Sequence, residues 1–477
     1  MQGLLDPLGF FAQSIFRGDG FMGYCSRVRV FVLIVWLIVG NFSSAEARTG
    51  QPFALASFAG LEAMRNSLGM ISNSAVIKGK FRASALKVFD NTFGATDVGL
   101  DLLVQMSALE VPELRARAEY NIHQILGVLA RIPRHGSGLF FRWYRPSEGG
   151  SWASVSDDDV SSIDNLHLAL ALWTASQRLV KKLPGLSAQA RCLYSAFDFT
   201  PFFDVERKLI GGNLRRKNGS WELEGYRYHL GSEARSLYFL GYALRLFKNV
   251  KDVDLLSSIA IAPLESIDKE GTALFKVWDG ALFQLFLPAL LIDEQRYHPG
   301  WRAAHVKVWR QLMNGKEQPC LPPAMSSATL VGVSFSSDTE EPLSLSYTGK
   351  AGHAWLKETS NPDEVFENLF VPHAALLAGL ENQEEALALL AQVEKCFSSH
   401  LVPAFLPQYG FVSAVRLELN SGVTVPGAVG VDKTIEALSL FTYLSSDRVS
   451  PCAAALQGNR SARLRLEEAY RNLSARL

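Results

Sequence analysis

Two carboxylates stand at the beginnings of apolar segments, where they could act as a general acid and a general base. Glu233 follows Ser232 and precedes a segment rich in Leu, Tyr and Phe, and Asp164 opens a run of alternating Leu and Ala. Burial raises the pKa of a carboxyl at such a position, whereas the amino end of a helix and the neighbouring Arg235 lower it. On residue type and spacing alone, the simpler interpretation is that both residues complete the first turn of a helix.

Other chemistries find little support in the sequence. The chain has no HExxH and no CxxC motif, and its 9 His are scattered, so we expect neither a metal site nor a cofactor. No nucleophile elbow, phosphate-binding loop or redox motif is present. The balance of 47 basic and 47 acidic residues argues against a nucleic-acid-binding protein, and a hydrophobic content of 48% argues against a disordered one.

The first 47 residues have the pattern of a secretory signal peptide. Arg27 and Arg29 precede the apolar run 30–39, and 43–47 has the small-x-small form of a signal-peptidase site. The run is too short to span a hydrocarbon layer about 30 Å thick. We therefore expect a mature chain from residue 48, periplasmic or secreted and without stable membrane association. An uncleaved anchor is the alternative, and Met22 begins a signal peptide of more normal proportions than Met1 does.

Residues 48–477 are predicted to form one all-α domain built from two kinds of helix. One kind is apolar all round, which indicates burial on every side, and the other has a single apolar stripe. In chain order they make six pairs, which predicts an (α/α)6 toroid of six inner and six outer helices. A solenoid is the alternative, but it needs a fixed repeat of about 30–45 residues, which we do not find. The expected inner helices are 84–106, 162–179, 230–248, 278–292, 364–381 and 431–446, and the outer ones 112–132, 186–197, 251–263, 298–313, 383–397 and 460–477.

The connections between the pairs are expected to lie at the mouth of the ring. Segments 138–144, 208–214 and 220–226 look strand-like, and 318–355 is long for a connection and rich in Ser, Pro and Gly. Long loops of that kind are usually functional or disordered. Their aromatic side chains could stack on sugar rings, although anchoring a loop to the core explains any single one of them equally well.

Five short motifs follow one another along the chain. They are Gly138–Arg145, Val160–Leu166, Gly231–Arg235, Trp278–Pro288, and Tyr409–Ala414 together with Gly430–Lys433. In this order they resemble the glucoamylase-like family of glycoside hydrolases, which includes β-1,2-glucanases and the chain-trimming domain of cyclic β-1,2-glucan synthases. The resemblance covers about residues 84–446. It implies an α/α toroid, in agreement with the helix pattern.

The resemblance also implies a function and a set of site residues. It implies a hydrolase that cleaves a β-glucan, in the first place a β-1,2-linked one, and whose partner is an oligo- or polysaccharide. Such hydrolysis usually needs one carboxyl to protonate the leaving oxygen and another to activate water or to attack directly. Glu233 is then the acid and Asp164 the second carboxyl, with Asp279 and Asp432 in reserve. The expected substrate-binding residues are Trp143, Tyr144, Arg142, His229, Arg235, Trp278, Gln284, Tyr409 and Asp432.

The chain departs from the family pattern at several acidic positions. Gln284, Arg145 and Ser413 stand where relatives carry an acid, and 322–327 replaces an acid-containing loop. These departures support an alternative, a catalytically degenerate protein that binds a glycan or a partner protein. The acidic run 157–159 before Asp164 is interpreted as a solvated charge run rather than as part of the site.

Overall fold

The structure is a computed structural model that describes most of the chain after the expected signal peptide. The residues described are 50–474, except for 67–68, 79–84, 148–150, 156–158, 270–271, 315–321, 328, 336–341, 349–350, 366, 399–403, 407, 419–420 and 425–426. The predicted signal peptide, 1–47, lies outside the described residues. Helices make up the body of the molecule, and small antiparallel sheets of two or three strands lie beside them.

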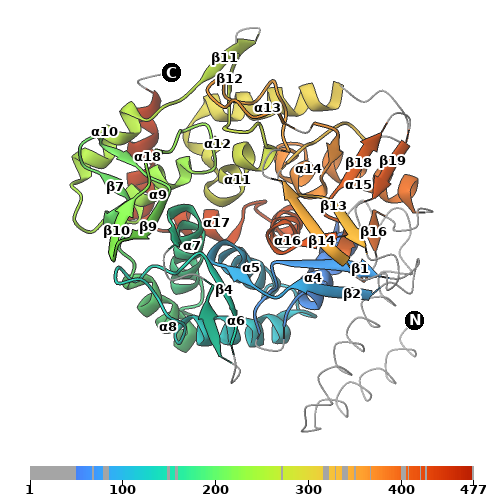
Figure 1. The fold of residues 1–477 in the computed structure, drawn as a ribbon, viewed down its shortest axis with the longest axis horizontal. Coiled ribbons are helices and arrows are strands. Elements are labelled where there is room, and N and C mark those ends of the chain that lie inside the picture. Colours follow the sequence, from blue (N-terminus) through green and yellow to red (C-terminus); the bar gives the residue numbers. More distant parts are fainter. Residues whose placement is uncertain are drawn as a thin grey trace.

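Six helices contact one another in a closed cycle around the centre of the molecule (Figure 1). Each contacts the next in chain order, and α16 returns to contact α5. Most residues of α7, including Leu168, Leu170 and Leu172, are buried, as expected of a helix that is apolar all round. The members are α5 (Ala95–Ala108), α7 (Ser162–Arg178), α9 (Arg235–Ala243), α11 (Leu282–Ile292), α14 (Pro372–Ala378) and α16 (Gly430–Leu444).

A second set of helices lies outside this ring (Figure 1). α6, α8, α10 and α15 each contact the ring helix that precedes them in the chain, α13 contacts α14, and α18 contacts α9. α18 buries a single stripe that includes Leu466, Tyr470 and Leu473, which confirms the prediction of half-exposed helices. The bounds are α6 (Arg115–Leu129), α8 (Pro184–Ser195), α10 (Asp252–Ile261), α13 (Pro299–Asn314), α15 (Gln383–Phe397) and α18 (Arg460–Ser474).

Three further helices were not expected from the sequence. α4 (Gln51–Ala63) packs on α16, the short α12 (Glu294–Tyr297) follows α11, and α17 (Pro451–Gly458) contacts α5, α7 and α11. Because these three ring helices stand at different places in the cycle, α17 must cross one end of the ring. Ser450 caps α17 by accepting a hydrogen bond from the Ala453 amide, and its hydroxyl donates to the Leu290 carbonyl of α11. α17 therefore bridges three of the ring helices.

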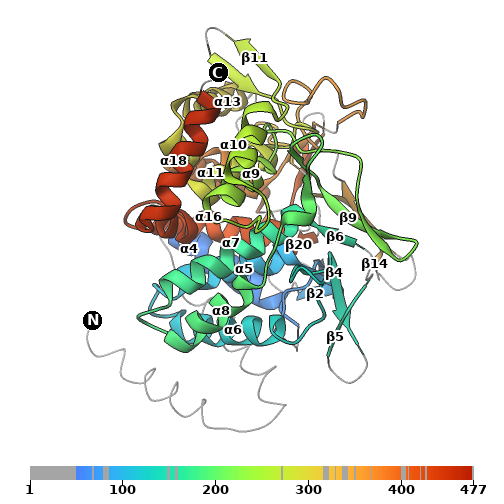
Figure 2. The same cartoon turned by 90° about the vertical axis from the view of Figure 1, so that its left-hand side faces the viewer.

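The strands gather at the other end, where the ring helices begin. Figure 2 shows β4, β6, β9 and β14 on the right-hand side and α18 on the left. β3, β6, β15 and β20 lead into α5, α7, α14 and α16. The strands are β1 (Ser74–Lys78), β2 (Ala85–Asp90), β3 (Phe93–Gly94), β4 (Trp143–Pro146), β5 (Trp152–Ser154), β6 (Asp159–Ser161), β7 (Phe203–Asp204), β8 (Leu209–Ile210), β9 (Asn213–Lys217), β10 (Ser220–Leu223), β11 (Ser266–Lys269), β12 (Thr272–Phe275), β13 (Thr329–Phe335), β14 (Pro342–Thr348), β15 (Leu369–Phe370), β16 (Phe405–Leu406), β17 (Gly410–Phe411), β18 (Val415–Glu418), β19 (Ser421–Thr424) and β20 (Gly427–Val429).

Strand pairing joins segments that are far apart in the sequence. The sheets have the orders β2-β1-β20, β10-β9-β6, β3-β4-β5 and β15-β18-β19, with the further pairs β11-β12, β13-β14, β16-β17 and β7-β8. β6 pairs with β9 in the register Ser161↔Asn213, which fixes the chain entering α7 beside the β9–β10 hairpin. β3 pairs with β4 in the register Gly94↔Trp143 and so ties the beginning of α5 to the first motif.

Several expected helix boundaries are wrong for one common reason. The segment 84–106 was expected to be helical throughout, but β2 and β3 occupy its first part and α5 begins at Ala95. The expected helix 364–381 begins only at Pro372, which follows β15 and is restricted to the first turn of a helix. The residues of β3 and β15 are buried, and the burial of such short strands cannot be distinguished from that of a helix by composition alone.

Two further observations concern the described residues. None of their helices is both long enough and apolar enough to cross a bilayer. Cys192 is exposed and Cys452 is buried, both as free thiols, whereas Cys396 is disulfide-bonded.

Candidate active site

Glu233 lies in the turn that leads into α9, at the strand-covered end of the ring. Its oxygen Oε2 is shielded from solvent and has no hydrogen-bond partner. Burial raises the pKa of Glu233 to about 7, and repulsion from Asp279 and Asp164 acts in the same direction, against its own backbone amide and Arg235. A carboxyl with this pKa keeps its proton near neutral pH, as a general acid requires.

Asp279 lies close enough to Glu233 to act on it electrostatically and has a similar environment. It is buried in the turn before α11, where one carboxylate oxygen accepts a hydrogen bond of 3.0 Å from the Ala281 amide. Burial raises the pKa of Asp279 to about 7 against that hydrogen bond. The turn itself requires Gly280, whose φ is +75° and whose absent side chain leaves room for the His353 carbonyl. The sequence placed Asp279 only in reserve.

Asp164 has a different environment, in the first turn of α7. Its Oδ1 accepts a hydrogen bond of 2.5 Å from the Thr96 hydroxyl of α5, and its Oδ2 lies 4.0 Å from Nε of Arg142. The same hydroxyl lies 3.0 Å from Nδ1 of His167, whose pKa burial lowers to about 4. A neutral imidazole, a hydroxyl and a guanidinium therefore surround a carboxylate that is partly open to solvent. Thr96 and His167 are site residues that carry no motif in the sequence.

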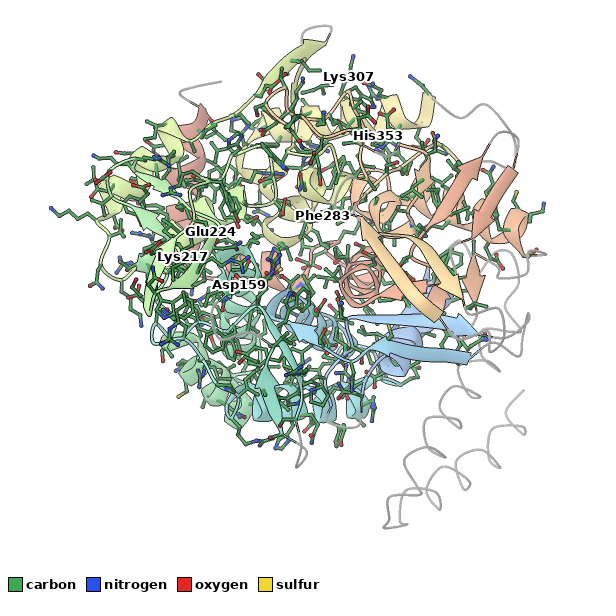
Figure 3. All side chains as sticks on the ribbon, in the orientation of Figure 1. Asp159, Lys217, Glu224, Phe283, Lys307 and His353 are labelled. Carbon is green, nitrogen blue, oxygen red and sulfur yellow. The ribbon has the colours of Figure 1, made fainter. Side chains whose placement is uncertain are left out.

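A chain of ion pairs leads outward from Asp164. Arg142 reaches Asp159 at 3.6 Å, Asp159 reaches Arg215 at 3.3 Å, and Arg215 reaches Glu224 at 3.1 Å. Figure 3 shows Asp159 near the centre of the ring and Glu224 farther out, towards the β9–β10 hairpin. Asp159 is buried in β6, and burial raises its pKa against the two arginines. For Asp159 the expected solvated charge run is therefore wrong; 157–158 lie outside the described residues.

On the opposite side of the ring, the beginning of α11 presents a neutral polar group. Gln284, which replaces the family acid, has a buried Oε1 without a hydrogen-bond partner. The adjacent Phe283 lies across the centre of the ring from Asp159 in Figure 3. Gln284 therefore places a neutral amide, rather than a carboxylate, at the beginning of α11. The other two departures differ from it: Arg145 is exposed on β4, and Ser413 is buried.

Trp278 and His229 are accessible at this end of the ring. Trp278 is 46% exposed, and the His229 ring stands nearly perpendicular to it, with 6.2 Å between centroids and 87° between planes. Nδ1 of His229 lies 2.5 Å from Oε2 of Glu358, a buried residue that the sequence analysis did not single out. Trp143 and Tyr409 are partly exposed. These four predicted residues can therefore still reach a ligand.

Two predicted substrate-binding residues are instead buried and hydrogen-bonded within the protein. Tyr144 is fully buried, and its hydroxyl donates to the Pro133 carbonyl and accepts from the Phe141 amide. Arg235 is also fully buried; it binds Glu294 through two nitrogens and donates its remaining hydrogens to backbone carbonyls. Neither side chain is open to a sugar, so the expectation of substrate contact is corrected for both.

Asp432 occupies the first turn of α16 and is buried. Its Oδ1 lies 3.5 Å from Nδ1 of His373, whose pKa burial lowers to about 3. The next residue, Lys433, forms a buried ion pair of 3.0 Å with Glu436. Asp432 therefore belongs to a buried polar cluster at the beginning of α16, on the side of the ring that also carries α5 and Thr96. No cluster of three or more potential metal ligands occurs among the residues that the structure describes.

Comparison with known proteins places this geometry in a wider context. No protein-family model and no curated protein matches the sequence. Solved structures do match: an endo-β-1,2-glucanase mutant from Talaromyces funiculosus in complex with β-1,2-glucan is 14% identical, with a TM-score of 0.70 and coverage of 92% of both chains. An endo-β-1,2-glucanase from Chitinophaga pinensis is 14% identical, with a TM-score of 0.60 and coverage of 93% of this chain and 98% of that one.

A third structure extends the comparison. A β-1,2-glucanase from Parabacteroides distasonis is 10% identical, with a TM-score of 0.63, and matches 91% of this chain but 60% of its own. At such identities the likeness establishes the fold and nothing finer. The five motifs led to the same group of proteins independently of the coordinates. The chain thus has the fold of the β-1,2-glucanases, and its resemblance to the glucoamylase-like glycoside hydrolases is confirmed at the level of the fold.

Proposed function

We propose that the protein is an exported glycoside hydrolase that cleaves a β-1,2-linked glucan, with Glu233 as general acid. The observation that carries the proposal is the shielded Oε2 of Glu233 together with a pKa of about 7. Glycosidases need one carboxylic acid that remains protonated at working pH. The solved structures of similar fold, one of them holding β-1,2-glucan, support this choice of substrate.

Asp164 is the better second carboxyl, and Asp279 the poorer one. Asp164 accepts a hydrogen bond from the Thr96 hydroxyl, lies 4.0 Å from Nε of Arg142 and is partly exposed, so a water molecule can reach it. Asp279, with a pKa of about 7, is largely protonated below neutral pH and cannot then accept a proton. In the proposed step, Glu233 gives its proton to the leaving glycosidic oxygen. Water attacks the anomeric carbon, and Asp164 accepts the proton that the water loses.

The decisive experiment is hydrolysis of β-1,2-glucan by the mature protein, followed as new reducing ends between pH 4 and 8. We expect turnover in the parent and its loss in Glu233→Gln. The matched control is Glu265→Gln, because the carboxylate of Glu265 binds Lys276 and Thr359 rather than a proposed catalytic residue. Failure to cleave this glucan at any pH would refute the proposal. Full activity in Glu233→Gln would refute the assignment of the acid.

A second candidate, glycan binding without turnover, is favoured by Gln284. An amide with an unpartnered Oε1 can bind a sugar hydroxyl but cannot exchange a proton as the family acid could. Calorimetric binding of β-1,2-gluco-oligosaccharides by a parent protein that releases no reducing ends would support this candidate.

The proposal includes the maturation and the architecture of the chain. We propose cleavage before residue 48 and export, testable by amino-terminal sequencing of the protein recovered outside the cytoplasm. We further propose that 48–477 form one (α/α)6 toroid. The cyclic contacts of the six ring helices support it, and a crystal structure together with a single cooperative unfolding transition would test it.

A further inference from the structure

The turn that contains Glu358 organises the rim of the site beside Glu233. The Glu358 amide donates to the Val277 carbonyl at 2.9 Å, and the Asn361 side chain donates to the Trp278 carbonyl at 2.8 Å. The turn therefore holds the backbone of Trp278 from both sides. This attachment fixes the backbone that carries the exposed indole of Trp278.

The same turn also contacts His229, through the side chain of Glu358. The Glu358 side chain is 1% exposed, and its Oε2 lies 2.5 Å from Nδ1 of His229, whose side chain is 28% exposed. The other oxygen, Oε1, is buried without a hydrogen-bond partner. It lies beside Gly231, where a Cβ would come within 3.3 Å of it and within 1.8 Å of the Lys276 carbonyl oxygen. The absence of a side chain at Gly231 therefore lets the carboxylate approach the loop that carries both His229 and Glu233.

A carboxylate on Nδ1 determines what the other ring nitrogen can do. The contact places the proton of a neutral imidazole on Nδ1, so Nε2 is left with its lone pair. Among the described residues nothing hydrogen-bonds to Nε2 of His229, and the imidazole stands nearly perpendicular to the indole of Trp278. An acceptor nitrogen next to an exposed aromatic face suits one sugar unit, whose ring stacks on the indole while a hydroxyl donates to Nε2.

We propose that Glu358 is a positioning residue that orients His229, so that Nε2 of His229 and the face of Trp278 form one glucosyl subsite next to Glu233. The inference rests on the proposed function and deepens it. It assigns to Glu358 a role in substrate affinity rather than in proton transfer. Glu358 reaches the sugar only through His229, so its effect on binding must disappear when His229 is absent.

A double-mutant cycle tests this dependence. Affinity for β-1,2-gluco-oligosaccharides is measured by calorimetry in a Glu233→Gln background, which prevents turnover. We expect Glu358→Ala and His229→Ala each to weaken binding by roughly threefold to tenfold, as for loss of a hydrogen bond between neutral groups. The double variant should be no weaker than either single one. Glu358→Gln, which keeps the shape, is expected to lose less than Glu358→Ala.

Glu265→Gln is the matched control, because Glu265 also binds this turn, through the amide and hydroxyl of Thr359, but does not contact His229. It should leave affinity unchanged. Three results would each overturn the inference while leaving the proposed function intact. They are unaltered affinity in both Glu358 variants, strictly additive losses of affinity in the cycle, and an equal loss of affinity in the control. If the wild type cleaves β-1,2-glucan but the variants give one of these results, the inference about Glu358 fails and the proposed function stands. If the Glu233→Gln parent binds no oligosaccharide and the wild type cleaves none, both proposals fail together.

Discussion

Replacing Glu233 by Gln should change catalysis and stability in opposite directions. The substitution keeps the shape of the side chain and removes its proton-donating capacity, so kcat should fall by about 10²- to 10⁴-fold, as for loss of a general acid. It also removes a buried carboxyl whose ionisation is unfavourable. Glu233 has a pKa of about 7 in the folded chain against an ordinary value of 4.5. At about 1.4 kcal/mol per pKa unit, the ionised form costs the folded state about 3 kcal/mol.

The sign of this effect follows from proton binding. Between pH 4.5 and 7 the folded chain holds a proton on Glu233 that the unfolded chain has already released. Stability attributable to this carboxyl is therefore fully present below pH 4.5, declines as pH rises and levels off above 7. Glu233→Gln should match the parent in unfolding free energy near pH 4 and exceed it by about 3 kcal/mol at pH 8.

Urea unfolding of both proteins at several pH values measures this difference. Glu265→Gln supplies a control of opposite sign, because hydrogen bonds from Thr359 and Lys276 outweigh burial and lower the pKa of Glu265 to about 2. Its carboxylate contributes stability above pH 4.5 that is lost as pH falls towards 2, so this variant should be less stable than the parent at neutral pH. If the difference in unfolding free energy between Glu233→Gln and the parent stays constant from pH 4 to 8, the assignment of a buried, protonated carboxyl is refuted.

Three further predictions concern neighbours of the acid. Asp279→Asn removes a negative charge that raises the pKa of Glu233, so the alkaline limb of the kcat/KM profile should move to lower pH; an unchanged profile would contradict the coupling. Arg235→Met leaves Glu294 buried without its counter-charge and should lower the unfolding free energy by about 3–5 kcal/mol in urea titrations, whereas removal of both charged groups should cost less. Gly231→Ala places a Cβ 1.8 Å from a backbone carbonyl oxygen and should lower the unfolding free energy by about 1–3 kcal/mol or more. A calorimetric Tm equal to that of the parent would contradict this close approach.

The family resemblance selected the two catalytic candidates, and apolar periodicity predicted the helices that carry them. Glu233 and Asp164 each precede or open such a helix, and the amino ends of α7 and α9 lie at the same end of the ring. The alternation of buried and half-buried helices therefore predicted a largely helical fold, with both carboxyls at the beginnings of buried helices. The lead-in strands were harder to foresee, because short apolar runs bury equally well as strand or helix.

A motif did not reveal which of its members face a ligand. Trp143 and Tyr144 are adjacent on β4, and since side chains of a strand alternate between its two faces, one remains accessible while the other enters the core. Arg235 follows Glu233 by two residues, yet it is fully buried against Glu294. Glu358 carries no motif at all; it meets His229 only through the fold of a distant turn, and no local pattern in the sequence signals that meeting.

The closure of the ring has a consequence for how the protein reaches its folded state. α16 is the last ring helix to be synthesised, and it packs against α5, the first, as well as against α4. Until α16 arrives, the apolar faces of α4 and α5 that it covers remain open to water, and the closing contact spans most of the polypeptide. Contacts between such distant segments slow folding and expose early intermediates to aggregation. A nascent chain released before α16 should therefore be a substrate for chaperones or proteases rather than a smaller working protein.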